Sequence, residues 1–181
     1  QPVQHDAATP TPAVIRKEIE AISSEIRHIC EDLSPSVLEN VGFLPALEWA
    51  LADAVAHLPA AEKFAYEFNC EADLEERMQL APSEQIQLYR IVQEALNNIC
   101  RHAHAKHVTM SVRSENETAL LIEIQDDGVG FDGIPTSKIG HGLANIRSRA
   151  NLISALISWQ NTRPGCRFVV QKTSALSVKE T

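Results

Sequence analysis

The segment that most constrains this chain is Gln125–Asp132, where two acids are followed by two glycines one residue apart. The apolar, β-rich run Ala119–Ile124 leads directly into it. Glycines at Gly128, Gly130 and Gly133 also match the spacing G-x-G-x-x-G, which is typical of dinucleotide-binding turns. The segment therefore indicates a nucleotide site, and its surroundings must decide which kind.

The surroundings disfavour a dinucleotide site. Such a turn opens a helix whose N-terminal amides hold a pyrophosphate, and an acid about 20 residues later holds the ribose. Here Gly133 is followed by residues 134–140, a polar loop that contains proline rather than a helix start. No Asp or Glu occurs between Gly133 and Lys179.

Length and composition bound the remaining options. With 181 residues, 44% of them hydrophobic, the chain suggests one domain with an appendage and an ordinary core. The net charge of −8 disfavours nucleic-acid binding, and no uncharged apolar run is long enough for a transmembrane helix. The four cysteines are far apart, so we expect reduced packing residues of a cytosolic domain.

The hydrophobic periodicity indicates a mixture of helices and strands without strict β-α-β alternation, which predicts an α+β fold. The segment 13–33 carries an apolar stripe that needs a partner helix, and Ser83 is a candidate cap for a long helix. Helices are expected at 13–33, 43–57, 82–102 and 143–152, and strands at 63–70, 107–113, 119–125, 156–161 and 167–171.

The long helix carries a polar face. Glu94 and Asn98 are four residues apart and share one side, with Arg101 and His102 one turn further on. A carboxylate, an amide oxygen and a cation on one face can meet a magnesium-bound phosphate chain, because hard cations prefer oxygen ligands. Taken alone, the same pattern is more typical of the solvated side of an amphipathic helix.

Two further segments carry residues suited to the same kind of site. Asp126, at a strand end, can accept a hydrogen bond from an exocyclic amine such as that of adenine, and the glycines beside it allow close backbone approach. Gly140-His141-Gly142-Leu143 opens a helix, which makes its amides a natural phosphate site. A simple turn and an ordinary loop remain the alternatives when each segment is taken alone.

The order and spacing of the three segments resemble the N box and the two glycine boxes of the GHKL ATPase superfamily. Residues 93–103 and 142–150 are similar to sensor histidine kinases of the nitrate-sensing and DesK-like type. Residues 25–35 and 42–47 are similar to the second dimerisation helix and the connector of that family. The resemblance covers roughly Ile19 to Gln171.

The resemblance implies a Bergerat fold, a two-layer α/β sandwich, preceded by an α-helical segment from a dimerisation domain. The implied division is a disordered edge at 1–12, the second dimerisation helix and connector at 13–58, a GHKL-type ATP-binding catalytic domain at 59–174 and a tail at 175–181. It further implies ATP and Mg²⁺ as cofactors and transfer of the γ-phosphoryl group to a histidine.

The resemblance also implies roles for individual residues. Asp126 would bind the adenine amine, Asn98 would ligate Mg²⁺, and Glu94 would orient the attacking group beside the metal. Arg101 and His102 would lie by the phosphates or by a lid over residues 131–139. The lid would be framed by Gly128, Gly130, Gly140 and Gly142, with His141 and Leu143 completing the second glycine box.

The implied partners are a response-regulator receiver domain and a second copy of the intact protein. We expect no nucleic acid, no direct membrane contact by this chain and a cytoplasmic location, and membrane anchoring of the intact protein through upstream segments is left open. The alternatives on the same fold are an anti-sigma-factor-type serine kinase and a nucleotide-binding pseudokinase.

Three positions depart from the family pattern. The acceptor histidine of the family is usually followed by an acid, whereas His28 is followed by Ile29, so we expect the acceptor upstream of Gln1. This chain alone should then bind ATP without phosphorylating itself. Residues 153–155 stand where members of the family often carry paired glycines. Residues 165–168 stand where members often carry G-x-G-T, and Arg167 at this place could contact phosphate or weaken nucleotide binding.

Overall fold

A computed structural model describes residues 38, 40–116, 118–130 and 141–173. The chain divides into two compact units, Gln1–Ser36 and Val37–Thr181. Every described residue belongs to the second unit. The expected helix at 13–33, in the first unit, and the expected lid at 131–139, in the second, both lie outside the described residues.

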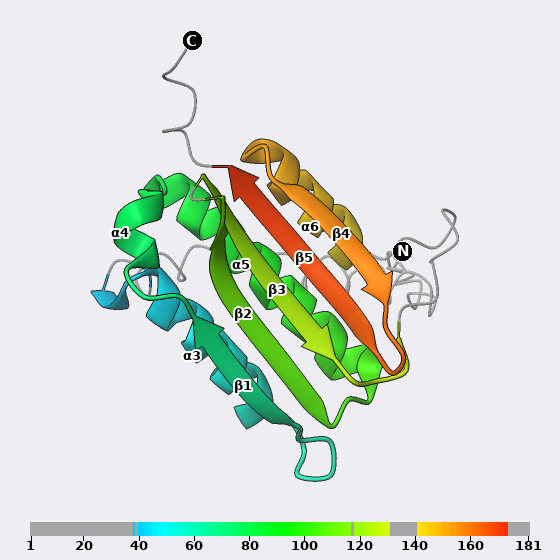
Figure 1. Cartoon of the computed structure of the whole chain (residues 1–181). Coiled ribbons are helices and arrows are strands. Elements are labelled where there is room, and N and C mark those ends of the chain that lie inside the picture. Colours follow the sequence, from blue (N-terminus) through cyan, green and yellow to red (C-terminus); the bar gives the residue numbers. More distant parts are fainter. Residues whose placement is uncertain (1–37, 39, 117, 131–140, 174–181) are drawn as a thin grey trace, which may run out of the picture. The chain divides into compact units, whose positions relative to one another are not determined.

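The second unit is built on a five-stranded mixed sheet with the order β1-β2-β3-β5-β4 (Figure 1). Only the pair β1–β2 is parallel, and the other three neighbouring pairs are antiparallel. The strands are β1 Ala65–Cys70, β2 His107–Glu115, β3 Ala119–Asp126, β4 Leu156–Asn161 and β5 Cys166–Thr173. All five expected strands are present, with ends shifted by one or two residues.

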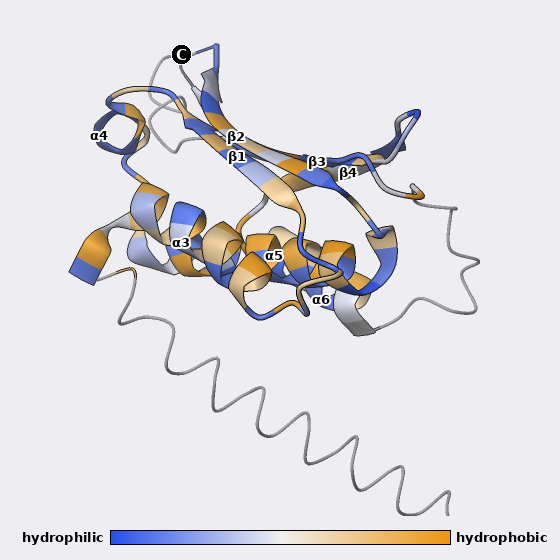
Figure 2. Ribbon diagram, turned by 90° about the horizontal axis from the view of Figure 1, so that it is seen from below, coloured by the Kyte–Doolittle hydropathy of each residue, from blue (hydrophilic) through white to orange (hydrophobic). Residues whose placement is uncertain are grey.

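Three helices form a second layer on one face of the sheet, which confirms the expected two-layer α+β architecture (Figure 2). They are α3 Phe43–Ala56, α5 Pro82–Asn98 and α6 His141–Leu152. The long helix α5 lies in the middle and contacts both α3 and α6. It therefore packs against the sheet and against both neighbouring helices, and its Leu88, Ile91 and Leu96 are buried.

Strict alternation along the strands separates the two faces of the sheet. In β3, Leu120, Ile122 and Ile124 are at most 1% exposed and face the helices, because successive side chains point to opposite faces. Each such buried side chain contributes about 1.5–3 kcal/mol. Asp126 continues this inward series, whereas Glu123 and Gln125 belong to the open face of the sheet.

The start of α5 differs from the expected one. Its N-cap is Ala81, not Ser83, and the Glu84 carboxylate accepts a hydrogen bond from the Ala81 N–H at 3.0 Å. The other oxygen of Glu84 pairs with the buried Lys172 ammonium at 3.0 Å. Ser83 could not cap because Pro82 already occupies the first helical position, where its missing N–H costs nothing.

The end of α5 also differs. The sequence predicts one helix as far as His102, but the α-helix stops at Asn98 and continues as a π-helical turn, η1, over Ile99–Ala103. Such wide turns occur mostly inside α-helices and frequently at functional sites. His104 then ends the helix in the left-handed conformation, with φ of 52°.

One helix was not expected from the sequence. The short α4, Leu74–Met78, lies between β1 and α5 and buries Leu74 and Met78. At five residues it is too short to show a helical period, and left-handed residues bound it at both ends.

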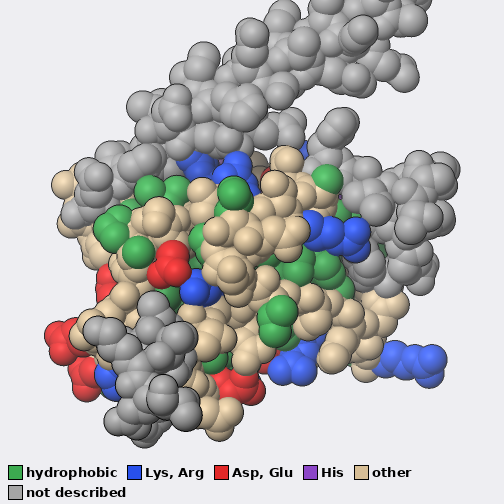
Figure 3. All heavy atoms as spheres, turned by 90° about the horizontal axis from the view of Figure 1, so that it is seen from above, with side chains coloured by type: hydrophobic (Ala, Val, Ile, Leu, Met, Phe, Trp, Pro, Cys, Tyr) green, Lys and Arg blue, Asp and Glu red, His purple; other side chains and the backbone are tan. Residues whose placement is uncertain are grey.

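Figure 3 shows acidic and basic side chains interspersed with apolar ones on the face seen from above. The three cysteines among the described residues, Cys70, Cys100 and Cys166, are free thiols, and Cys70 is exposed rather than packed in the core as the sequence predicted. Within the described part of the chain, no helix has the length and apolarity needed to cross a membrane.

Candidate functional site

The polar face of α5 meets the first turn of α6. A Cβ on Gly142 would overlap the carboxylate oxygen of Glu94 and lie 3.5 Å from the amide oxygen of Asn98. Gly142 is therefore where the backbone of α6 approaches both polar side chains. The structure brings together three residues that the sequence predicted as parts of one site.

The helix start at this point suits an anion. The first amides of a helix have no partner within the helix, and its dipole favours negative charge there. Leu143, 7% exposed, anchors this first turn in the core. Glu94 and Asn98 are both half-buried, so the place where they meet α6 is sheltered and still open to a ligand.

Asp126 lies at the end of β3 on the helix-facing side and is only 5% exposed. One carboxylate oxygen accepts the Gly128 N–H at 2.8 Å. Burial raises the pKa of the Asp126 carboxyl, while the backbone N–H groups of Gly128 and Cys166 act in the opposite direction. A buried carboxylate with free accepting capacity can bind one amine group with high selectivity.

Asp127 has a different task, although it is the next residue. Its carboxylate accepts the backbone N–H groups of Lys106 at 2.7 Å and His107 at 2.9 Å. The His107 and Lys106 donors lower the pKa of Asp127 to about 2. Asp127 therefore fastens the turn to the start of β2, and Asp126 alone faces the helix layer.

The first glycine box crosses the end of η1. A Cβ on Gly128 would overlap the carbonyl group of Ala103, and that carbonyl accepts the Val129 N–H at 2.8 Å. Gly130 has φ of 81°, a conformation that favours glycine. The close contact at Gly128 and the positive φ of Gly130 therefore explain why glycine occupies both positions.

A residue outside the expected site completes the turn. Gly165, at the tip of the β4–β5 hairpin, has φ of 93°, and a Cβ there would overlap the carbonyl of Asp126. The Pro164-Gly165 pair marked this hairpin in the sequence, but no local pattern showed which segment its tip contacts. The contact holds the backbone of Asp126 from the side opposite η1.

Arg167 lies away from this site. It is on the open face of the sheet, where its guanidinium forms two hydrogen bonds with the Glu123 carboxylate, at 2.7 and 2.6 Å. The Arg167 partner lowers the pKa of Glu123. Asp126 points to the opposite face, so the role of Arg167 as a phosphate contact, one of the two considered above, does not fit its position.

The remaining expected residues lie around this arrangement. Arg101 and His102 are exposed on η1, and Arg101 lines a pocket of about 220 Å³ with Glu62, Phe64 and Cys100. Gly140 lies outside the described residues, and His141 is the first residue of α6. The described residues contain no cluster of three His, Cys, Asp or Glu side chains that could hold a metal.

The site nevertheless fits a magnesium nucleotide in its donor chemistry. Mg²⁺ is usually held by one or two protein ligands together with substrate phosphates and water. Asn98 and Glu94 offer an amide oxygen and a carboxylate beside amides suited to phosphate.

Comparisons with known proteins agree with this geometry. Residues 83–174, just over half of the chain, match the family model described as histidine kinase-, DNA gyrase B-, and HSP90-like ATPase. The signal transduction histidine-protein kinase/phosphatase DegS of Brevibacillus brevis is 30% identical over 139 residues, which cover 77% of this chain and 34% of that protein. The sensor histidine kinase NarS of Mycobacterium tuberculosis is 26% identical over 176 residues, covering 93% of this chain and 39% of that protein.

The fold is also similar to that of a solved histidine kinase. The Acinetobacter baumannii histidine kinase AdeS superposes with a TM-score of 0.60 at 15% identity, covering 94% of this chain and 88% of that chain. This chain spans about a third of the length of the curated relatives it matches. The chain therefore belongs to the histidine kinase-, DNA gyrase B- and HSP90-like ATPase family, and it is a catalytic ATPase domain of the sensor histidine kinase type.

Proposed function

We propose that this chain binds Mg-ATP and supplies the γ-phosphoryl group for phosphorylation of a histidine in a two-component sensor kinase. The observation that carries the proposal is the meeting of Glu94, Asn98 and the first turn of α6 at Gly142. Phosphoryl transfer requires positioning and neutralisation of charge more than covalent chemistry by the protein. The site combines an anion-binding helix start with oxygen ligands for a cation.

Each residue then has a task. Asp126 accepts a hydrogen bond from the adenine amine, and Gly128 and Gly130 allow the backbone to approach the ring. Asn98, with Glu94 beside it, holds Mg²⁺, which would neutralise charge on the phosphates. Glu94 also orients the attacking histidine, so its carboxylate must stay close to the metal.

The other expected site residues complete the proposal. Arg101 and His102 lie near the phosphates or the lid, and Gly140, His141, Gly142 and Leu143 form the far end of that lid. We further propose the domain division given above, in which 13–58 is the second dimerisation helix and connector. Its last part, α3, packs into the same hydrophobic core as α5 and α6.

We propose that the acceptor histidine lies before Gln1 in the intact protein and that the phosphoryl group passes on to an aspartate of a response regulator. The intact protein would act as a homodimer, with this part of it in the cytoplasm. The pseudokinase alternative rests on Arg167, and the pairing of Arg167 with Glu123 on the other face of the sheet supports the kinase proposal over it.

Calorimetry with a nonhydrolysable ATP analogue tests the proposal. We expect Mg²⁺-dependent binding by the wild-type chain and at least a tenfold weaker affinity in Asn98→Ala, equivalent to about 1.4 kcal/mol, because the variant lacks the amide oxygen proposed to hold the cation. Asn97→Ala is the matched control, because Asn97 is the exposed neighbour on the same helix. Equal affinities in both variants would remove Asn98 from the site, and absence of binding by the wild type would refute the function.

A further inference from the structure

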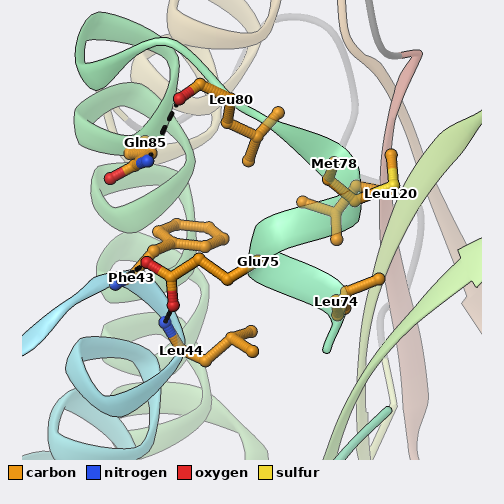
Figure 4. Close-up of a pocket in the computed structure, with 8 residues that line it drawn as sticks. All are labelled: Phe43, Leu44, Leu74, Glu75, Met78, Leu80, Gln85 and Leu120. Atoms are coloured by element: carbon orange, nitrogen blue, oxygen red, sulfur yellow. Dashed lines mark hydrogen bonds between the residues drawn. The ribbon is translucent and has the colours of Figure 1, made fainter. Parts of the chain in front are cut away.

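Two pockets of the ATP-binding unit differ in what they can hold. The one beside α4 has a volume of about 10 Å³, the least that a single water molecule requires. Its polar side chains are already used: Glu75 accepts the N–H of Phe43, the first residue of α3, at 2.8 Å, and Gln85 donates to the Leu80 carbonyl (Figure 4). The pocket of about 220 Å³ beside η1 differs in both respects.

This larger pocket lies on the α3 side of the central helix. The Cys100 thiol lines it and donates a hydrogen bond to the Ala54 carbonyl of α3 at 3.9 Å. Phe64, just before β1, and Ile99 are 7% and 9% exposed and give it an apolar floor. Asn98 instead meets α6, which flanks α5 on the other side (Figure 1). The pocket is therefore separate from the place proposed for the magnesium phosphates.

The rim of the pocket is basic. Arg101, His104 and Lys106 stand there, all exposed, and Glu62 is the one acid among its lining residues. Within the part of the chain that the structure describes, neither Arg101 nor Lys106 forms an ion pair. Other cations of this unit pair with glutamates: Arg77, Arg167 and Lys172. In a protein of net charge −8, cations gathered above an apolar floor favour an anion from outside.

The groups around the pocket are held in place. The Lys106 N–H donates to the Asp127 carboxylate at 2.7 Å, and the Lys106 carbonyl accepts the Ala65 N–H at 2.8 Å. Burial raises the pKa of the Cys100 thiol, and the Arg101 charge acts in the opposite direction, so that charge lies close to the pocket floor. Because its pKa is raised, the thiol stays protonated at neutral pH and does not repel an anion.

We propose that this pocket binds a small organic carboxylate, with the carboxylate at Arg101 and Lys106 and an apolar body against Phe64 and Ile99. Arg101, Lys106 and Glu62 together leave one net positive charge, which suits a monoanion better than a phosphate ester of about −1.5 to −2. The volume is below the roughly 300–1,000 Å³ of pockets for drug-sized ligands, so the ligand is small. The site is additional to the nucleotide site and does not depend on the function proposed above.

An NMR titration of the full chain with three probes tests the proposal. Benzoate joins a carboxylate to an apolar ring, benzyl alcohol keeps the ring without the charge, and acetate keeps the charge without the ring. We expect benzoate to shift the backbone amides of residues 99–106 and to bind at least tenfold more tightly than either other probe. Equal affinity for acetate or benzyl alcohol would overturn the proposal. So would shifts concentrated at Gly142 and Leu143, which would place the anion in the nucleotide site.

Charge variants locate the carboxylate, and Arg101 is left unchanged in them because it is also proposed to lie near the phosphates or the lid. Lys106→Gln should weaken benzoate binding about fivefold, as for a partly exposed ion pair, and leave the affinity for the ATP analogue within twofold. Glu62→Gln should strengthen benzoate binding. Lys63→Gln is the matched control: Lys63 is an exposed neighbour of Phe64 that does not line the pocket, so its effect should stay below twofold.

Three results would contradict the pocket as a carboxylate site. Equal effects of Lys106→Gln and Lys63→Gln would show that benzoate responds only to the general charge of the surface. No benzoate binding by the wild type would leave the cations as solvated surface. A fall in the affinity for both ligands in Lys106→Gln would indicate a structural role of Lys106. Absence of ATP binding by the wild type would refute the proposed function alone, so the two failures are distinguishable.

Discussion

Gly165 lies directly against the backbone carbonyl of Asp126, so closely that no side chain fits between the hairpin tip and the end of β3. We therefore expect Gly165→Ala to push Asp126 out of place and weaken binding of the ATP analogue at least tenfold. The positive φ of 93° adds strain, for a total loss of about 2 kcal/mol or more in the free energy of unfolding.

The measurement is calorimetry at low temperature, where the variant stays folded, together with urea denaturation. Arg163→Ala, exposed at the same hairpin, should leave both the affinity and the stability within the error of the wild type. Unchanged affinity in Gly165→Ala would show that Asp126 does not depend on the hairpin.

Binding of the ATP analogue should depend on pH through Asp126. The adenine amine needs the ionised carboxylate as acceptor, and burial raises the pKa of Asp126 above that of an ordinary aspartate, about 3.9. As the pH falls, the carboxyl group is therefore protonated earlier, and affinity is lost at a higher pH. We expect Asp126→Asn to bind about tenfold more weakly at neutral pH, because a neutral amide oxygen is a weaker acceptor than a carboxylate.

The informative quantity is the ratio of wild-type to Asp126→Asn affinity between pH 7 and pH 4.5. Titration of the ligand phosphates cancels in this ratio, because both proteins bind the same analogue. The ratio should fall as the pH is lowered, because the wild type alone loses the charged acceptor. A ratio that stays constant over this range would contradict a role for the Asp126 carboxylate in adenine binding.

Arg167→Thr should leave nucleotide binding intact. Arg167 pairs with Glu123 on the open face of the sheet, away from Asp126. We expect the affinity for the ATP analogue to stay within twofold and the free energy of unfolding to fall by at most about 1 kcal/mol, as is usual for partly exposed ion pairs. A tenfold change in affinity, measured by calorimetry, would place Arg167 in the site after all.

Ser154→Gly should stabilise the protein. Ser154 has φ of 53°, a left-handed conformation that glycine adopts without strain. We expect the free energy of unfolding to rise by about 0.5 kcal/mol in urea denaturation. The neighbouring Ala155→Gly is the control and should lower it by up to about 1 kcal/mol, because Ala155 is buried and has no positive φ.

The sequence allowed the local parts of the fold to be predicted. Alternation located β1, apolar and β-rich runs bounded by turn residues located the other four strands, and the spacing of Glu94 and Asn98 located the face of α5 that meets Gly142. Arg167 was left open, although its position one residue before the inward-facing Phe168 already placed it on the outer face of β5. The two-residue period of β5 therefore indicates that Arg167 faces away from the helices, whatever its residue type.

The contacts that were not predicted join segments far apart in the chain. Glu75 caps a helix start 32 residues before it, and α4 is too short to show a period. Gly165 supports Asp126 through the backbone of another hairpin, and a hairpin turn does not specify what its tip touches. Such contacts depend on how the layers pack, which local propensity does not encode.

The wide turn at Ile99–Ala103 has a consequence for the geometry of the whole helix. Each residue of an α-helix advances the side-chain direction by about 100°, so one additional residue in a turn changes the phase of all that follows. The residues before the turn keep the phase required by α6 at Gly142, and the turn itself ends with the Ala103 carbonyl directed to the Val129 N–H. One continuous helix thus contacts both α6 and the segment after β3, which a regular helix would hold out of register.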